Sequence, residues 1–209
     1  VIVSPNPFYA EAGGQVGDKG ILQSVTAKLK VLDSRNMVKG LPVLECTVVD
    51  GVLNNNETVS AVVDSESRKS TARNHTATHI LHKALKEVLG DHVKQSGSLV
   101  APDRLRFDFT HFAGISRDDL FEIEEKVNQA VLENYQVSTE KMALDEALEK
   151  GVVALFGEKY DESVRVVSVG DVSSELCGGT HVERSGEIGM FKILSESSVA
   201  SMPTPLAHV

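Results

Sequence analysis

A single helical pattern organises the middle of the chain, and it reads Asn74-His75-Thr76-Ala77-Thr78-His79-Ile80-Leu81-His82-Lys83-Ala84-Leu85-Lys86-Glu87-Val88-Leu89-Gly90. The period becomes helical from Ser65 onward, and at about 100° per residue the apolar side chains share one broad arc. Three histidines form a narrow stripe beside that arc. Asn74 suits the N-cap position and Gly90 the C-cap position, so we predict a helix from residue 74 to residue 90.

The section before this helix has the pattern of β-strands. Residues 27–32 alternate polar and apolar side chains, and residues 43–49 and 59–63 are rich in β-branched residues. Asp50-Gly51 is predicted to form a hairpin turn, because Gly accepts a positive φ. A Gly-rich stretch over residues 12–20 comes first. We therefore predict a small β-barrel subdomain over residues 1–64.

Residues 65–209 are predicted to form an α+β core, so the fold class is α+β. Strands are expected near residues 93–100, 105–109, 136–142, 164–169 and 188–194, and a short helix near residues 145–150. Ser116 and Asp119 resemble a capping box at the start of a second long helix. The predicted core face of that helix consists of Leu120, Ile123, Val127, Ala130 and Val131.

Composition excludes several classes of protein. With 209 residues, of which 41% are hydrophobic and 24% charged, the chain can bury a core. It contains neither an apolar run long enough for a membrane span nor the features of a signal peptide, and two cysteines cannot build a disulfide scaffold. We expect a cytoplasmic protein, and Val1 in place of Met suggests processing or a piece of a longer chain.

The charge is unevenly distributed along the chain, whose net charge is −9. Only residues 65–111 are net positive, with 8 Lys and Arg against 5 Asp and Glu. A phosphate-bearing partner is expected to touch this segment, where Arg68, Lys69 and Arg73 precede the histidines. Ordinary solvated helix charge is the alternative for each of these residues.

Two separate motifs suggest one metal site. His75 and His79 lie one helical turn apart, a spacing that lets both bind the same ion. Cys177-Gly178-Gly179-Thr180-His181 adds a thiolate and an imidazole on a tight loop. Together the four ligands suit one tetrahedral zinc ion, which can be catalytic or purely structural. His82 is interpreted as a surface histidine, with a supporting role behind the ligands as the alternative.

Five stretches, taken together and in this order, resemble the editing domain of bacterial-type alanyl-tRNA synthetase. They are Phe8-Tyr9-Ala10-Glu11-Ala12-Gly13-Gly14-Gln15-Val16-Gly17-Asp18-Lys19-Gly20, Arg73-Asn74-His75-Thr76-Ala77-Thr78-His79, Gln95-Ser96-Gly97-Ser98-Leu99, Ala154-Leu155-Phe156-Gly157-Glu158-Lys159-Tyr160 and Cys177-Gly178-Gly179-Thr180-His181. Free-standing alanyl-tRNA editing proteins are similar in the Gly-rich and metal motifs. Gly13-Gly14-Gln15 also resembles a release-factor tripeptide, but here we interpret it as part of the Gly-rich loop.

The resemblance implies hydrolysis of Ser-tRNA(Ala) and Gly-tRNA(Ala), with His75, His79, Cys177 and His181 binding one Zn²⁺ ion. It also links Gln95 to recognition of the mischarged amino acid. A synthetic site sized for alanine cannot strongly reject serine or glycine, so a second, hydrolytic site is needed. A metal-bound water, or a water beside the metal, can attack the ester.

These considerations give the candidate site residues. Gln95 and Cys177 are the candidate catalytic residues, and the candidates for binding the amino acid are Gln95, Ser96, Thr76 and Thr180. The expected partners are the acceptor end of alanine tRNA and other domains of a parent synthetase, with no membrane and no DNA. Three alternatives stay open: a zinc-stabilised RNA-binding module without catalysis, a domain that only positions tRNA for a neighbouring catalytic domain, and a free-standing trans-editing protein.

Overall fold

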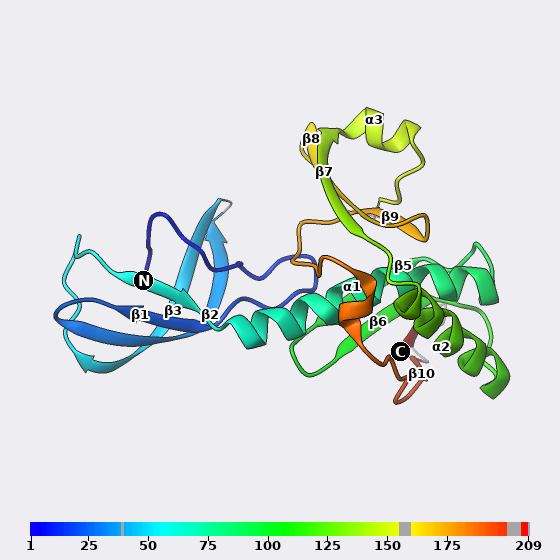
Figure 1. The fold of residues 1–209 in the computed structure, drawn as a ribbon, viewed down its shortest axis with the longest axis horizontal. Coiled ribbons are helices and arrows are strands. Elements are labelled where there is room, and N and C mark those ends of the chain that lie inside the picture. Colours follow the sequence, from blue (N-terminus) through cyan, green and yellow to red (C-terminus); the bar gives the residue numbers. More distant parts are fainter. Residues whose placement is uncertain (39, 155–159, 200–205, 209) are drawn as a thin grey trace.

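The computed structural model describes residues 1–38, 40–154, 160–199 and 206–208. Figure 1 shows an N-terminal sheet on one side and the other elements on the opposite side, connected by a long helix, α1 (Ser65–Leu89). The predicted α+β class is confirmed. Within the described ranges, no helix is both long and apolar enough to cross a bilayer.

The N-terminal sheet is antiparallel, with strand order β3-β2-β1-β4. Its strands are β1 (Gly20–Gln23), β2 (Ala27–Val38), β3 (Leu41–Gly51) and β4 (Ser60–Val63). Alternation along the strands places Leu22, Leu29 and Leu44 on one face, where they pack with Phe8. Among the described residues no closed barrel forms, so the predicted barrel is wrong: closure requires the edge strands β3 and β4 to pair, and they lie at opposite edges.

Asp50-Gly51 is not the predicted hairpin turn. Both residues belong to the end of β3, where Gly51 pairs with Ala27 and Asp50 with Lys28. Gly51 does have a positive φ of 71°. A Cβ atom at this position would lie 1.9 Å from the carbonyl oxygen of Thr26. Glycine is therefore required by close contact between two strands and not by a two-residue turn.

Helix α1 begins earlier than predicted. Its N-cap is Asp64, whose carboxylate accepts a hydrogen bond of 3.1 Å from the backbone N–H of Ser67. Asn74 lies inside the helix, and its side-chain amide donates to the carbonyl oxygen of Ala101 at 2.7 Å. The predicted C-cap, Gly90, is confirmed, since its N–H donates to the carbonyl oxygen of Lys86.

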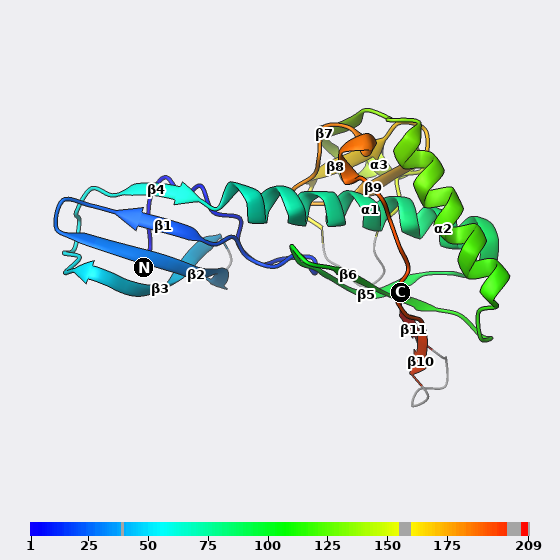
Figure 2. The same cartoon turned by 60° about the horizontal axis from the view of Figure 1, so that its bottom comes forward.

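Two further sheets lie on opposite sides of the C-terminal part of α1 (Figure 2). One has strand order β10-β11-β6-β5 and contains β5 (Gln95–Val100), β6 (Leu105–Thr110), β10 (Ser197–Val199) and β11 (Leu206–His208). The other, ordered β7-β8-β9, contains β7 (Val137–Ala143), β8 (Ser163–Val169) and β9 (Ser173–Leu176) and packs with the short helix α3 (Leu144–Glu149). Helix α1 therefore has a protein layer on both sides.

Helix α2 (Arg117–Leu132) packs on α1 and carries the capping box predicted at Ser116 and Asp119. Ile123 and Val127 are fully buried in one cluster with Ile80, Leu81 and Phe107. Ala130 and Val131 are also buried, whereas Leu120 is half-buried. The predicted core faces of both helices are thus largely confirmed.

The strand predicted at residues 188–194 does not form. A short 3₁₀ helix, η1 (Ser185–Ile188), is followed by an extended segment held by side chains of α2. Asn128 donates to the carbonyl oxygen of Phe191 and accepts from its N–H, both at 2.9 Å, and Glu124 accepts from the N–H of Ile193 at 2.8 Å. Side chains of a helix therefore satisfy the backbone groups that a neighbouring strand would otherwise bind.

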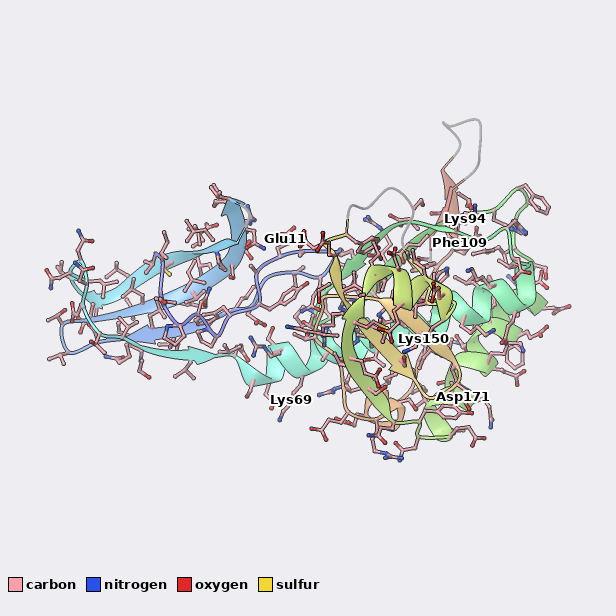
Figure 3. All side chains as sticks on the ribbon, turned by 90° about the horizontal axis from the view of Figure 1, so that it is seen from above. Glu11, Lys69, Lys94, Phe109, Lys150 and Asp171 are labelled. Carbon is pink, nitrogen blue, oxygen red and sulfur yellow. The ribbon has the colours of Figure 1, made fainter. Side chains whose placement is uncertain are left out.

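The Gly-rich segment joins the N-terminal sheet to the rest of the fold. The N–H of Glu11 donates to Ser34 of β2, and Figure 3 labels Glu11 at this junction. A few residues later, the N–H of Val16 donates to Val100 of β5, and the N–H of Val100 donates to Gly14. A segment from the first quarter of the chain is therefore hydrogen-bonded into the core.

Candidate metal centre

Four side chains converge on one point between α1 and the loop after β9: His75, His79, Cys177 and His181. Their donor atoms lie within 4.8 Å of one another. The Sγ of Cys177 lies 3.3 Å from the Nε2 atoms of both His75 and His181. Tetrahedral zinc with ordinary bond lengths holds a nitrogen and a sulfur about 3.6 Å apart, so this spacing fits such an ion.

His75 is oriented by Gln15. The Nδ1 of His75 lies 2.7 Å from the Oε1 of Gln15, and that oxygen also accepts from the backbone N–H of Thr180 at 2.9 Å. Because a backbone N–H can only donate, the shared atom must be the amide oxygen and Nδ1 of His75 must carry the proton. The Nε2 of His75 is then left with its lone pair toward Cys177.

His181 is oriented by Thr76 in the same way. The hydroxyl of Thr76 donates to the carbonyl oxygen of Ala72 at 3.0 Å and accepts from the N–H of Val182 at 3.3 Å. Its remaining lone pair lies 3.2 Å from Nδ1 of His181, which therefore donates. Thr76 is fully buried, and its hydroxyl supports a ligand.

His79 is oriented by the buried carboxylate of Glu175. One carboxylate oxygen lies 2.7 Å from Nδ1 of His79, and the other lies 2.9 Å from Nδ1 of His82. Ser173 donates a third hydrogen bond at 3.2 Å. His82 is buried and so is not the predicted surface histidine; it shares the carboxylate of Glu175 with His79, which fits the alternative of a supporting role behind the candidate ligands.

The Nε2 of His79 is buried and has no hydrogen-bond partner in the part of the chain that the structure describes. A buried unpaired nitrogen is costly unless a ligand satisfies it. This atom faces the other three donors, and all three imidazoles have Nδ1 bound by an oxygen. The residues therefore fit a bound divalent metal, and a set of three nitrogens and one sulfur suits zinc.

The electrostatics also favour a cation. Burial raises the pKa of the Cys177 thiol, but its contacts with the imidazoles of His181 and His75 outweigh burial and hold that pKa far below its usual range. Burial would likewise raise the pKa of Glu175, yet its close contact with His79 outweighs burial and lowers that pKa. A thiolate and a carboxylate thus lie within one buried cluster, and burial lowers the pKa of His181 to about 3, so its imidazole is neutral.

Arg165 and Gly179 fix the loop that carries the sulfur. Nη1 of Arg165 donates to the carbonyl oxygens of Cys177 and Gly179 at 3.0 and 2.5 Å. The N–H of Gly179 points back to the sulfur of Cys177 at 3.4 Å. Any side chain at Gly179 would collide with the ring of His75. The loop can approach α1 only because it has no Cβ there.

Three of the four candidate metal ligands, His75, His79 and Cys177, line a pocket of about 460 Å³. The lining includes the polar side chains of Gln95, Thr78 and Ser98, and it includes Tyr9, which precedes the Gly-rich segment. A register shift between Gln95 and Gly97 interrupts the pairing of β5 with β6 beside this pocket. The structure thus places Gln95 next to the candidate metal site.

None of the other predicted substrate-binding residues lines the described part of the pocket. Ser96 is exposed and does not line the described part of the pocket, whereas Ser98 does. Thr180 lies beside Gln15, and its hydroxyl accepts from the amide of Gln15 at 2.9 Å. Substrate contacts by Ser96, Thr76 and Thr180 stay predictions. Of the motif at residues 154–160, residues 155–159 lie outside the described residues.

The three predicted tRNA-binding residues also differ in their surroundings. The guanidinium of Arg68 is bound by the buried carboxylate of Asp18, with Nε at 3.0 Å, and by the carbonyl oxygen of Pro7. Lys69 is exposed on the part of α1 between the two halves of the molecule (Figure 3). Arg73 is half-buried and has no hydrogen bond or ion pair within the described ranges.

Sequence reasoning missed Gln15, Glu175 and Arg165. Gln15 was within a quoted motif, but its role depends on a contact with residues that lie far along the chain. Glu175 offered a usable signal, because ligating histidines commonly donate to a nearby carboxylate and this glutamate lies two residues before Cys177. Arg165 gave no local signal.

Comparison with known families identifies the kind of protein. Residues 164–204 match the family described as "Threonyl and Alanyl tRNA synthetase second additional domain", and residues 1–67 match "tRNA synthetases class II (A)". The two matches contain three of the pieces that build the site: the Gly-rich segment, β8 and the loop with Cys177 and His181. The chain is thus of the class II tRNA synthetase kind.

Individual relatives narrow this class to one family. The chain is 50% identical to the alanine-tRNA ligase of Desulforamulus reducens, 53% to that of Carboxydothermus hydrogenoformans and 50% to that of Pseudoalteromonas translucida. Each match covers 201 residues, which is 96% of this chain and 23% of the relative. The chain belongs to the alanine-tRNA ligase family and spans about a quarter of the length of these curated relatives.

Proposed function

We propose that this chain hydrolyses the ester that joins serine or glycine to alanine tRNA, as the proofreading part of an alanine-tRNA ligase. One observation carries the proposal: three members of the four-residue metal cluster, His75, His79 and Cys177, line a pocket that Gln95 also lines. The site is large enough for an aminoacyl ester with part of its terminal nucleoside, since ligand pockets are about 300–1,000 Å³. Family membership supports the substrate class.

The reaction adds water across the ester. The carbonyl–oxygen bond breaks, and the products are the free amino acid and a tRNA with its terminal hydroxyl restored. A divalent cation in this site would supply Lewis-acid polarisation of the ester carbonyl. The protein would supply position: His75, His79 and His181 are each held by an oxygen partner on Nδ1, and the loop at Cys177 is fixed by Arg165.

Selectivity would come from Gln95 and the polar groups beside it. An amide that hydrogen-bonds the serine hydroxyl is left unpaired when alanine occupies the same place, and a buried unpaired polar group is costly. Glycine lacks this hydroxyl as well, so this hydrogen bond explains the selection of serine over alanine and not the hydrolysis of glycine. We further propose that Lys69 and Arg73 contact tRNA phosphates.

The test compares serine-charged with alanine-charged alanine tRNA. The parent protein should release serine quickly and alanine no faster than the uncatalysed rate. Cys177→Ala should abolish serine release, whereas Cys46→Ala, at a half-buried cysteine of the N-terminal sheet, should keep it. Serine release at the same rate with and without the parent protein would reject the proposal.

A structural zinc site in a tRNA-binding module is the second candidate. It is favoured by the four protein ligands, because catalytic zinc normally keeps one position open. This reading predicts that serine-charged tRNA binds without being hydrolysed. It also predicts that Gln95→Ala leaves tRNA affinity and stability unchanged, while a metal chelator lowers the thermal midpoint of unfolding.

A further inference from the structure

Gln15 is fully buried next to the metal centre, although it belongs to the Gly-rich segment and to neither metal motif. Its side-chain amide makes three polar contacts with two residues. The oxygen Oε1 accepts from the backbone N–H of Thr180 and lies 2.7 Å from Nδ1 of His75. The nitrogen Nε2 donates to the hydroxyl of Thr180 at 2.9 Å.

We propose that Gln15 is a positioning residue of the metal centre. Its amide oxygen keeps the proton of His75 on Nδ1 and so leaves Nε2 for the ion. The same amide holds both the N–H and the hydroxyl of Thr180, the residue just before the ligand His181. One side chain thus fixes one ligand from α1 and the neighbour of another ligand from the loop.

The segment around Gln15 is itself anchored in the core. Gly14 accepts from the N–H of Val100 at 2.8 Å, and the N–H of Val16 donates to Val100 at 3.0 Å. A Cβ at Gly14 would lie 2.7 Å from the carbonyl oxygen of Ser98. The segment is therefore pressed against β5 on both sides of Gln15. The N-terminal region does more than flank the core, because it supplies a part of the metal centre.

The inference depends on a metal at this site and not on the proposed hydrolysis, so binding of metal alone tests it. Gln15→Met keeps the volume and removes all three hydrogen bonds. It should weaken Zn²⁺ affinity about 10–100-fold, as removal of a ligand's hydrogen-bond partner typically does. With Co²⁺ as the probe, the visible absorption bands should shift, because His75 is no longer held in the coordination sphere.

Gln15→Glu provides the rescue. A carboxylate can accept from Nδ1 of His75, from the N–H of Thr180 and from its hydroxyl, so this variant should bind Zn²⁺ like the parent. Gln15→Asn withdraws the amide by one methylene and should bind more weakly, which gives a second disruptive variant should Gln15→Met unfold. Gln23→Met, at an exposed glutamine of β1, is the matched control and should change nothing.

Parent-like Zn²⁺ affinity and Co²⁺ spectrum in both Gln15→Met and Gln15→Asn would overturn the inference. Weak Zn²⁺ binding by Gln15→Glu would overturn it as well. A hydrogen-bond acceptor for Nδ1 of His75 would then not be enough to preserve the site. Failure of the parent to bind either ion would overturn both this inference and the metal centre. If the parent protein binds metal normally but releases no serine, that result would count against the proposed function alone.

Discussion

Gly179 reveals how little space separates the sulfur-bearing loop from α1. A Cβ atom at Gly179 would lie 2.1 Å from Cε1 of His75 and 2.7 Å from Oε1 of Gln15. At the neighbouring Gly178, no described atom outside the adjacent residues lies within 4 Å of such a Cβ. The two glycines are adjacent in sequence, yet only one of them lies against the metal centre.

We therefore predict that Gly179→Ala displaces the ring of His75 and lowers Zn²⁺ affinity about 10–100-fold, comparable to the loss of a partner that orients a ligand. Gly178→Ala should keep the parent affinity. Competition with a chromophoric chelator measures both variants. Equal affinity in the two variants would contradict the close packing at this point.

At the same scale, the convergence of the four candidate ligands could be predicted from sequence because they occur in two short motifs with characteristic spacing. Gln15 and Glu175 could not be assigned their roles in this way. Each contacts residues at least 60 positions away along the chain, and such contacts exist only after the Gly-rich segment and β9 have packed on α1. The residues adjacent to Gln15 and Glu175 in the sequence therefore do not indicate these contacts.

At the scale of elements, local signals gave the helices and most strands but misplaced several boundaries. Asn74 is a good capping residue, yet Asp64 caps α1, because Thr71 and Ala72 are buried and extend the packed face toward the N-terminus. The segment at residues 188–194 is apolar like a strand, but Asn128 and Glu124 of α2 bind its backbone. Tertiary contacts decided both cases.

Glu57 forms hydrogen bonds that link the β1–β2 connection to the β3–β4 connection of the N-terminal sheet. Its carboxylate accepts from the hydroxyl of Thr26 at 2.7 Å and from the N–H of Asn54 at 3.0 Å. Hydrogen bonds from Ser24 and Thr26, with the backbone of Asn54, lower the pKa of Glu57 from 4.5 to about 2. A lowered folded-state pKa contributes stability above pH 4.5 that is lost as the pH falls toward 2.

We predict that the urea midpoint of the parent falls between neutral pH and pH 3 by more than the midpoint of Glu57→Gln does, because the variant has no carboxylate to protonate. Glu45→Gln, at an exposed glutamate of β3, is the control and should follow the parent. Identical pH profiles for the parent and Glu57→Gln would show that this carboxylate does not stabilise the sheet.

At the scale of the whole molecule, three segments far apart in sequence meet at the metal centre. They are the Gly-rich segment, α1 and the loop after β9. The N-terminal sheet has its own apolar cluster around Leu22, Leu29 and Leu44, away from that meeting point. The division at residue 64 stays a prediction, and the hydrogen bonds of Gly14 and Val16 with Val100 cross it.

Removal of the metal should therefore lower local stability near the metal centre and leave the N-terminal sheet unchanged. After treatment with a chelator, we predict faster amide hydrogen exchange in residues 9–18 and 173–182, and unchanged protection in β1 and β2, because only the former segments depend on the metal centre. Exchange that accelerates equally in all of these segments would indicate one cooperative unit instead.

We propose that the three imidazoles and the thiolate bind a single zinc ion. X-ray absorption at the zinc edge of the purified protein is the decisive test. We predict one sulfur at about 2.3 Å and three nitrogens at about 2.0–2.1 Å, with the sulfur signal lost in Cys177→Ala. A zinc ion surrounded by nitrogen and oxygen alone, or a protein that binds no zinc, would contradict this ligand set.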